Sequence, residues 1–562
     1  MSRVVAARVA SDGLAFGPAV VITDGDVPDD LATDRIFADV ARTTSDRLLA
    51  IAGAVRADGR TEEADVLDAY ALVATDPALA KDVDARVAGG QPLVGAVRAA
   101  IDATVAVFAA MDDEYFRQRA DDVAGVGREL VATIAGTHDL LLAIPDGAVI
   151  CARDLTPADT VRLDLARVGA IATEQGGPTS HTAIVARAAG IPAVVGAVGL
   201  LDAVSEVSAR SEGAPVTVLV DGDAGAVVVD PDVTTVRDVE LRMGAAKELV
   251  VRQRAYRGRR VHHDGRRILV AANVGGSAEL AAAVEAAADG IGLLRSEFLF
   301  LERTEAPGRD EQRDAYRAAV EAFEDPTVVR TLDIGGDKVV PYLDLPREEN
   351  PFLGVRGLRL CLAHPELFDA QLDALLAVED HARLRIMFPM VSSAADVAAG
   401  AARLAERAAL AGVAPPPLGV MVETPAAALL APALAPHVAF FSIGTNDLTQ
   451  YVTAADRTNG ALGMHQDPAN PAVLQLVDRT CRAADAAGIH VAVCGEAASD
   501  PAVAVMLLGL GVTELSVAAG RIDRIRWLVD QVDPERVRAV ARDALTLPDA
   551  EAVRELVAPL LP

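Results

Sequence analysis

Residues 418–423 read Leu418-Gly419-Val420-Met421-Val422-Glu423, a short apolar run that ends on a carboxylate. Seven other apolar runs of similar length lie between residues 268 and 517, and each gap between neighbouring runs is long enough to hold a helix. Strands that alternate with helices are typical of a parallel sheet, and eight such units predict a (β/α)₈ barrel, also called a TIM barrel. The other runs are 268–272, 290–294, 328–332, 384–388, 438–443, 490–493 and 512–517.

Polar side chains stand at or near the C-terminal ends of seven of these eight runs. In a (β/α)₈ barrel these ends meet at one mouth, where catalytic residues are found, so we expect the polar groups to converge there. Ordinary polarity at strand ends would explain any single case, but a mixture of cations, carboxylates and a thiol favours a site. The residues are Asn273, Arg295, Arg330 with Asp333, Glu423, Asn446 with Asp447, Cys494 and Ser516.

The residue types at this mouth favour a small, phosphorylated anion as substrate. Arg295 and Arg330 would supply planar, permanently charged donors for phosphate or carboxylate oxygens. Glu423 and Asp447 end neighbouring runs and are suited to share a Mg²⁺ ion, although a pair of salt bridges to nearby arginines is the alternative. Lys338 is one of only three lysines and lies in a glycine-rich loop, which favours a phosphate contact.

Cys494 has two interpretations. A cysteine after an apolar run is usually a buried structural residue, but a thiol facing the mouth could donate a proton.

The sequence lacks the common nucleotide-binding motifs. No lysine follows a glycine, which excludes a phosphate-binding loop of the G-x-x-x-x-G-K-[ST] type. No G-x-G-x-x-G follows a predicted strand, so a dinucleotide site is unsupported. A phosphoryl donor other than a nucleotide is therefore favoured.

A second informative stretch, residues 176–187, reads GGPTSHTAIVAR and places His181 where a glycine-rich turn becomes a helix. Thr179 or Ser180 is a natural N-cap, which puts His181 in the first helical turn. The free backbone N–H groups and the positive end of the helix dipole disfavour imidazolium and favour a bound anion. A neutral imidazole beside an anion site suits a phosphoryl-accepting histidine, whereas the plain alternative is a histidine near a helix cap with no chemical role.

The patterns along the chain predict four parts. Short β-like runs in 1–25 and 139–230 predict one compact α/β domain. Residues 26–138 have helical periodicity and predict a bundle inserted near its first strands. Residues 231–256 predict a charged linker helix, and 257–562 contain the barrel.

The chain has 562 residues, a formal charge of −29 and four cysteines, none of them in a C-x-x-C pair. The negative charge argues against binding to nucleic acid or to an anionic membrane surface. The cysteine spacing is typical neither of a disulfide framework nor of a zinc site and indicates a reducing compartment. Since no signal peptide and no apolar stretch of about 18 residues is found, we expect a cytoplasmic protein without a membrane partner.

Several long motifs in order give the chain a specific resemblance, which runs over nearly its whole length. It is similar to enzyme I of the bacterial phosphoenolpyruvate:sugar phosphotransferase system, the phosphoenolpyruvate–protein phosphotransferase family. The motifs are residues 113–115, 176–187, 292–298, 330–338, 349–356, 422–425, 444–451 and 494–496.

The resemblance implies a swivelling phosphohistidine α/β domain with an inserted helical bundle, a linker helix and a barrel that dimerises. It implies that phosphoenolpyruvate donates its phosphoryl group to Nε2 of His181, that Cys494 protonates the enolate to pyruvate, and that the bundle docks the carrier protein HPr. Glu423 and Asp447 would ligate Mg²⁺. The substrate-binding residues would be Arg295, Arg330, Asn446, Asp447 and Arg457, with Arg356 and Lys338 nearby.

Two other functions remain open at this point. Pyruvate phosphate dikinases and phosphoenolpyruvate synthases share the histidine and the barrel, but they need a large nucleotide-binding domain, for which there is no room ahead of His181. A regulatory relay protein could keep the fold and only bind partners. The intact set of arginine, carboxylate, cysteine and histidine residues argues against the relay.

Overall fold

The computed structural model describes the chain apart from residues 1, 23–26, 58–60, 110–113, 137–143, 156, 178–179, 212–213, 302, 337, 339, 344, 346–347 and 458. The side chains of 57, 61–63, 109, 114–121, 157–158, 162, 181, 188 and 460–461 also lie outside this description. The chain divides into two compact units, Met1–Lys247 and Glu248–Pro562. The division falls within helix α9 (Val233–Arg254), in the range expected for the linker.

The second unit contains the predicted (β/α)₈ barrel, which confirms the fold class. Its strands pair in parallel in chain order, and β10 pairs with both β11 and β17, so the sheet closes on itself. A short strand that the sequence did not predict, β9 (Val261–His263), pairs antiparallel with the start of β10. The barrel strands are β10 Arg266–Val274, β11 Ile291–Arg295, β12 Thr327–Arg330, β13 Leu384–Phe388, β14 Leu418–Val422, β15 Phe440–Ile443, β16 His490–Val493 and β17 Glu514–Val517.

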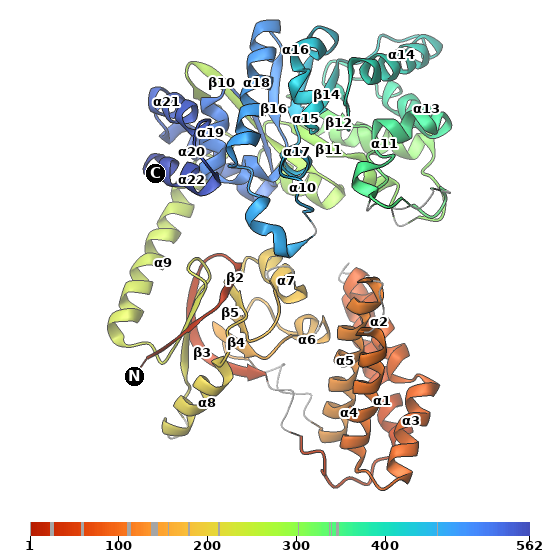
Figure 1. Ribbon diagram of the computed structural model, residues 1–562, viewed down its shortest axis with the longest axis vertical. Helices are drawn as coiled ribbons and strands as arrows, with labels where there is room; N and C mark the ends of the chain where they lie inside the picture. The colour runs from red at the N-terminus through yellow and green to blue at the C-terminus, as the bar shows by residue number, and fades with distance from the viewer. Residues whose placement is uncertain are drawn as a thin grey trace. The chain divides into compact units, whose positions relative to one another are not determined.

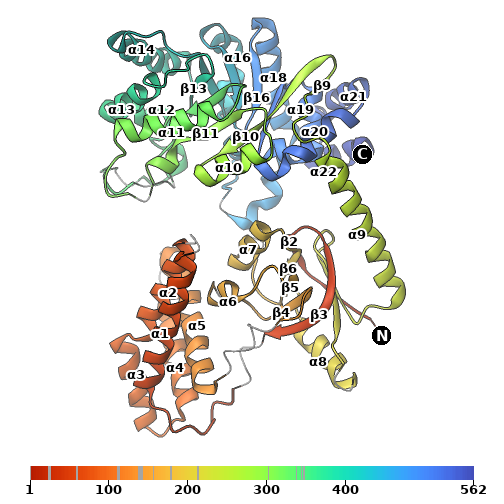
Figure 2. The same cartoon turned by 180° about the vertical axis from the view of Figure 1, so that it is seen from behind.

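Helices surround these strands on the outside, as the two opposite views of Figures 1 and 2 show. Several of these helices begin with an aspartate or asparagine N-cap that is followed by a proline. The proline ring already holds the backbone angle φ at a helical value, as at Asp500-Pro501 and Asp533-Pro534. The helices are α10 Ser277–Glu285, α11 Arg309–Glu321, α12 Leu358–Ala363, α13 Pro365–Leu376, α14 Ala394–Ala411, α15 Pro425–Leu429, α16 Ala431–Leu434, α17 Thr445–Thr453, α18 Pro471–Ala487, α19 Pro501–Gly509, α20 Ile522–Gln531, α21 Pro534–Ala544 and α22 Ala550–Val557.

The barrel strands are buried on both faces, and alternate residues fill two separate cores. Leu294, Val329 and Phe441 belong to the large outer core beneath the helices. Their chain neighbours point the other way, because successive side chains of a strand alternate between its faces. The neighbours form a small cluster of their own inside the barrel, which contains Leu293, Val328, Met387, Met421, Phe440 and Cys494.

The first unit contains an α/β domain built on a sheet with strand order β1-β8-β7-β3-β4-β5-β6-β2. Alternate residues of its central strands again face opposite sides. Val149 and Cys151 share a core with Leu200 of α8, whereas Ile150 shares the other core with Ala183 of α7. The elements are β1 Arg3–Ala6, β2 Arg8–Ser11, β3 Leu14–Ile22, β4 Ala148–Ala152, α6 Pro157–Arg162, β5 Val168–Thr173, α7 His181–Ala189, β6 Ala193–Val195, α8 Leu200–Arg210, β7 Thr217–Asp221 and β8 Ala226–Val229.

The helices between β3 and β4 form the predicted bundle and stand side by side in Figures 1 and 2. They share one apolar core, which includes Leu48, Leu67, Val97 and Leu130. Their bounds are α1 Phe37–Ala57, α2 Thr61–Ala74, α3 Pro77–Ala88, α4 Leu93–Ala109 and α5 Glu114–Ala135. In the described part of the chain, no helix combines the length and the hydropathy needed to cross a membrane.

The barrel interior supplies a first prediction. A Cβ added at Gly419 would lie 2.3 Å from the ring of Phe440, which is itself fully buried. We expect Gly419→Ala to destabilise the barrel by about 1–3 kcal/mol, the usual cost of overpacking a core. The control is Gly520→Ala, because nothing lies within 4 Å of a Cβ at that position. Calorimetric unfolding of the full chain measures both, and equal midpoints for the two variants would contradict the packing described.

Candidate functional site

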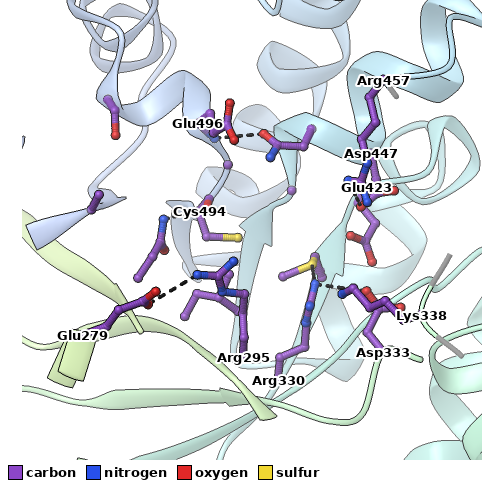
Figure 3. Close-up of a pocket in the computed structure, with 18 of the residues that line it drawn as sticks. Glu279, Arg295, Arg330, Asp333, Lys338, Glu423, Asp447, Arg457, Cys494 and Glu496 are labelled. Carbon is purple, nitrogen blue, oxygen red and sulfur yellow. Dashed lines mark hydrogen bonds and ion pairs between the residues drawn. The ribbon is translucent and has the colours of Figure 1, made fainter. Parts of the chain in front are cut away.

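A cavity of about 580 Å³ opens at the C-terminal ends of the barrel strands. The side chains labelled in Figure 3 come from different strands, loops and helices and converge on this space. The structure brings together here the barrel residues that the sequence singled out for a site, except Ser516, which does not line the cavity. The residues that do line it are Asn273, Arg295, Arg330, Asp333, Lys338, Arg356, Glu423, Asn446, Asp447, Arg457 and Cys494.

Asp333 joins two arginines at the floor of the cavity. Its Oδ2 lies 3.2 Å from Nη1 of Arg330 and 3.0 Å from Nη2 of Arg356. All three residues are buried. Burial alone would raise the pKa of the Asp333 carboxyl, but the two guanidinium groups reverse this effect and lower it to about 2. Asp333 is therefore ionised at neutral pH and fixes both arginines.

Glu297 is a buried carboxylate that contacts two cationic side chains of the cavity and was not singled out from the sequence. It lies in a short 3₁₀ helix after β11, and its Oε1 accepts a hydrogen bond from Nη2 of Arg330. The same oxygen lies 3.4 Å from Nζ of Lys338. The only available signal was its place in the 292–298 motif, two residues after Arg295. Glu297 therefore positions Arg330 and Lys338 on one side of the cavity.

Asp447 also holds two arginines of the cavity. It lies in the first turn of α17, and its Oδ1 is 3.1 Å from Nη1 of Arg356. Its Oδ2 is 3.5 Å from Nη1 of Arg457, whose guanidinium also lies over the ring of Phe352. The neighbouring Asn446 accepts a hydrogen bond from the backbone N–H of Glu496. Arg356 therefore links the loop that carries Asp333 to helix α17.

Arg295 differs from the other arginines because it is half exposed. Its Nη2 lies 3.4 Å from Oε2 of Glu279, a residue of α10 that the sequence analysis did not single out. Such exposed pairs contribute only about 0–1 kcal/mol, so an anionic ligand can replace Glu279 at little cost. Figure 3 shows this pair at the edge of the cavity.

Cys494 follows β16, and its side chain belongs to the cluster inside the barrel. The thiol donates a weak hydrogen bond to the carbonyl of Ile443 at 3.7 Å. Burial raises the pKa of Cys494 to about 12, although Ser442 and Arg330 act in the opposite direction. The thiol is therefore protonated at neutral pH, which a proton donor requires and a nucleophile would not.

The carboxylates Glu423 and Asp447 fit a hard divalent cation. In the described part of the structure Glu423 forms no ion pair, and its Oε1 accepts a hydrogen bond from the N–H of Met390 at 2.6 Å. Burial raises the pKa of Glu423, and the nearby Asp447 and Asp333 carboxylates raise it further, to about 8. Mutually repelling carboxylates beside an open cavity are a donor set that Mg²⁺ accepts when water and substrate complete its shell. The described residues hold no group of three or more metal-ligating side chains.

His181 belongs to the first unit and is the first residue of α7. Ser180 caps this helix by accepting a hydrogen bond from the N–H of Ala183, and Gly190 ends it in a left-handed conformation. The position of His181 in the first helical turn is therefore as predicted. Its imidazole lies outside the described side chains, as do Glu114 and Tyr115. The motif residues Asp113, Pro178, Thr179 and Asp337 lie outside the described residues altogether.

Comparison with known proteins gives matches along the chain. Three family models match: "PEP-utilising enzyme, N-terminal" over residues 7–119, "PEP-utilising enzyme, mobile domain" over 144–225, and "PEP-utilising enzyme, PEP-binding domain" over 252–534. The phosphoenolpyruvate-protein phosphotransferase of Staphylococcus carnosus is 37% identical over 576 residues, with 99% of each chain covered. That of Haloferax volcanii is 42% identical and covers 88% of this chain and 87% of its own. The multiphosphoryl transfer protein of Rhodobacter capsulatus is 44% identical, but the chain spans only 57% of its length.

The network around Asp333 gives the second prediction. Asp333→Asn removes a buried negative charge that two buried arginines share, which typically costs about 3–5 kcal/mol. Asp314→Asn is the matched control, since Asp314 also contacts two arginines, Arg313 and Arg317, but is half exposed. We expect the control to change stability by about 1 kcal/mol or less. Denaturant unfolding of the full chain measures both, and similar effects of the two substitutions would contradict the buried network.

Proposed function

Because the chain belongs to the PEP-utilising enzymes and, among them, to the phosphoenolpyruvate-protein phosphotransferases, we propose that it moves the phosphoryl group of phosphoenolpyruvate to His181 and then to the carrier protein HPr, releasing pyruvate. The chain is thus a transferase of the phosphotransferase system. The observation that carries the proposal is one cavity that combines arginines, paired carboxylates and a protonated thiol.

Substrate binding is assigned to the cationic side chains of the cavity. Arg295, Arg330 and Arg457 present guanidinium groups that match phosphate and carboxylate oxygens in geometry and charge. Arg356 and Lys338 add charge nearby, and Asn446 offers an amide. Since Asp333, Glu297 and Asp447 hold most of these groups before substrate arrives, little ordering is needed on binding.

The proposed metal is Mg²⁺, held by Glu423 and Asp447. As many carboxylates as cationic side chains line the cavity, so a substrate with several negative charges needs additional positive charge. When bound, the ion supplies that charge and neutralises oxygens of the transferred group.

The transfer itself requires one nucleophile and one acid. A neutral nitrogen of His181 attacks phosphorus, the bond from phosphorus to the enol oxygen breaks, and an N–P bond forms. The enolate left behind takes the thiol proton of Cys494 at its methylene carbon and becomes pyruvate, after which water reprotonates the sulfur. The start of α7 supports the histidine's role, because a helix N-terminus disfavours imidazolium and stabilises the phosphoryl anion.

Three further parts of the proposal rest on membership of the family. His181 and the cavity belong to different units, so transfer requires the 1–25 and 139–230 domain to move, with the 231–256 segment as its hinge. The bundle within 26–138 would dock HPr. The 257–562 barrel would form the homodimer.

The acceptor role of His181 gives the third prediction. His181→Ala removes the nucleophile but none of the cavity, so we expect phosphorylation of HPr to fall below detection while phosphoenolpyruvate binds within about twofold of the wild-type affinity. Labelled phosphoenolpyruvate with Mg²⁺ and HPr measures transfer, and calorimetry measures binding. His437→Ala, an exposed histidine of the barrel unit, is the control. An acid-labile label on the His181→Ala protein would refute the assignment.

The proton donor gives the fourth prediction. Cys494→Ala should lower the rate of pyruvate release by about 10²–10⁴-fold, the usual contribution of a positioned general acid. The affinity for Mg²⁺ should stay unchanged, because the sulfur is not among the proposed ligands. Cys151→Ala tests a buried thiol of the other unit and should leave pyruvate release unchanged. Unchanged release in Cys494→Ala would return Cys494 to a packing role.

A further inference from the structure

A second cavity, of about 560 Å³, opens at the opposite end of the barrel, and the proposed reaction makes no use of it. Its walls come from the end of β9, the start of β10, helices α18 and α21, and the turn that precedes β17. These are the N-terminal ends of the strands, whereas the first cavity lies at their C-terminal ends. Residues at this end of a barrel ordinarily serve stability, so a charged cavity here needs its own explanation.

Four arginines and three aspartates line this second cavity, in a chain whose formal charge is −29. Each aspartate pairs with one arginine, as Arg266–Asp485, Arg482–Asp478 and Arg538–Asp264. Arg542 is left over, and its guanidinium makes no hydrogen bond or ion pair with any residue that the structure describes. The cavity therefore has an unmatched positive charge, one helical turn from Arg538 on the same face of α21.

His263 adds a buried polar atom without a partner. The residue lines the cavity and is only 6% exposed. Among the described residues, nothing forms a hydrogen bond with its Nδ1. Buried polar atoms in folded proteins usually have a partner, so the unpaired Nδ1 of this cavity-lining residue leaves hydrogen-bonding capacity for a ligand.

Apolar side chains form another part of the wall. Ile268, Leu508, Leu510, Val512 and Leu545 all line the cavity, which makes it suited to a carbon skeleton as well as to a charged group. The volume lies within the range typical of small-molecule sites, about 300–1,000 Å³.

We propose that this second cavity binds a small organic oxyanion, whose phosphate or carboxylate group contacts Arg538 and Arg542 and accepts a hydrogen bond from His263. The ligand's carbon atoms lie against the leucines. Asp264 is half exposed, so an oxyanion that competes with it for Arg538 displaces only a weak pair.

The test uses the full chain and two probes, inorganic phosphate and citrate, titrated by calorimetry. The variant Arg538→Gln/Arg542→Gln removes the proposed contacts. Arg536→Gln is the matched control, because Arg536 is an exposed arginine of the same helix that does not line the cavity. Arg295→Gln is measured in parallel to identify binding at the catalytic end. Thermal unfolding without anion establishes that every variant is folded.

We expect wild type, Arg536→Gln and Arg295→Gln to retain a binding event that weakens at least tenfold in the double variant. A stronger signal with phosphate identifies a phosphate ester as the ligand class, and a stronger signal with citrate identifies a carboxylate. Equal affinities in all proteins would overturn the proposal. So would an equal loss in Arg536→Gln, because binding would then depend only on overall charge.

Discussion

The carboxylate of Asp333 lies between two guanidinium groups where water does not reach, and the rest of the catalytic end depends on this arrangement. A buried arginine without a counter-ion is very costly, and Asp333 is the counter-ion that Arg330 and Arg356 share. Arg356 then continues the chain of contacts to Asp447 on α17. One aspartate thus connects the loop after β12 with a helix more than a hundred residues further along the chain.

Burial raises the pKa of both Asp333 and Cys494, but the net shifts of the two groups are opposite. At Asp333 the nearby positive charges outweigh desolvation, and the carboxyl remains ionised. At Cys494 desolvation outweighs the nearby Arg330, and the thiol remains protonated. In the proposed function, the ionised Asp333 holds cations for an anionic substrate, and the protonated Cys494 keeps a proton available. In each case the interior strengthens the charge state that the residue type already has at neutral pH.

Much of the barrel could be predicted because its strands are buried on both faces and read as unbroken apolar runs. The runs 384–388, 418–422 and 490–493 coincide with β13, β14 and β16. The run 438–443 begins too early, since Val438 ends the preceding 3₁₀ turn before β15 starts at Phe440. Strand β9 was missed because its three residues include two histidines and form no apolar run.

From the residues alone, the site was predictable mainly where strand ends carry its side chains. Lys338 was indicated by its glycine-rich loop, and Arg356 and Arg457 only by the resemblance. Cys494 follows its strand directly, and Asp447 comes soon after β15. Glu279 and Glu297 lie in helical segments, and their roles depend on which arginine the fold brings near them. The second cavity could not be foreseen at all, because its walls come from distant segments with no shared motif.

The protonated state of Cys494 also determines how this sulfur meets oxidants. Peroxides and alkylating reagents attack thiolates, and a thiol with a pKa near 12 offers almost none at neutral pH. If Cys494 is the proton donor proposed above, its thiol is thereby spared conversion to sulfenic acid between cycles. Compounds designed to modify this position covalently would meet the same barrier, whereas reversible anions that occupy the cavity would not.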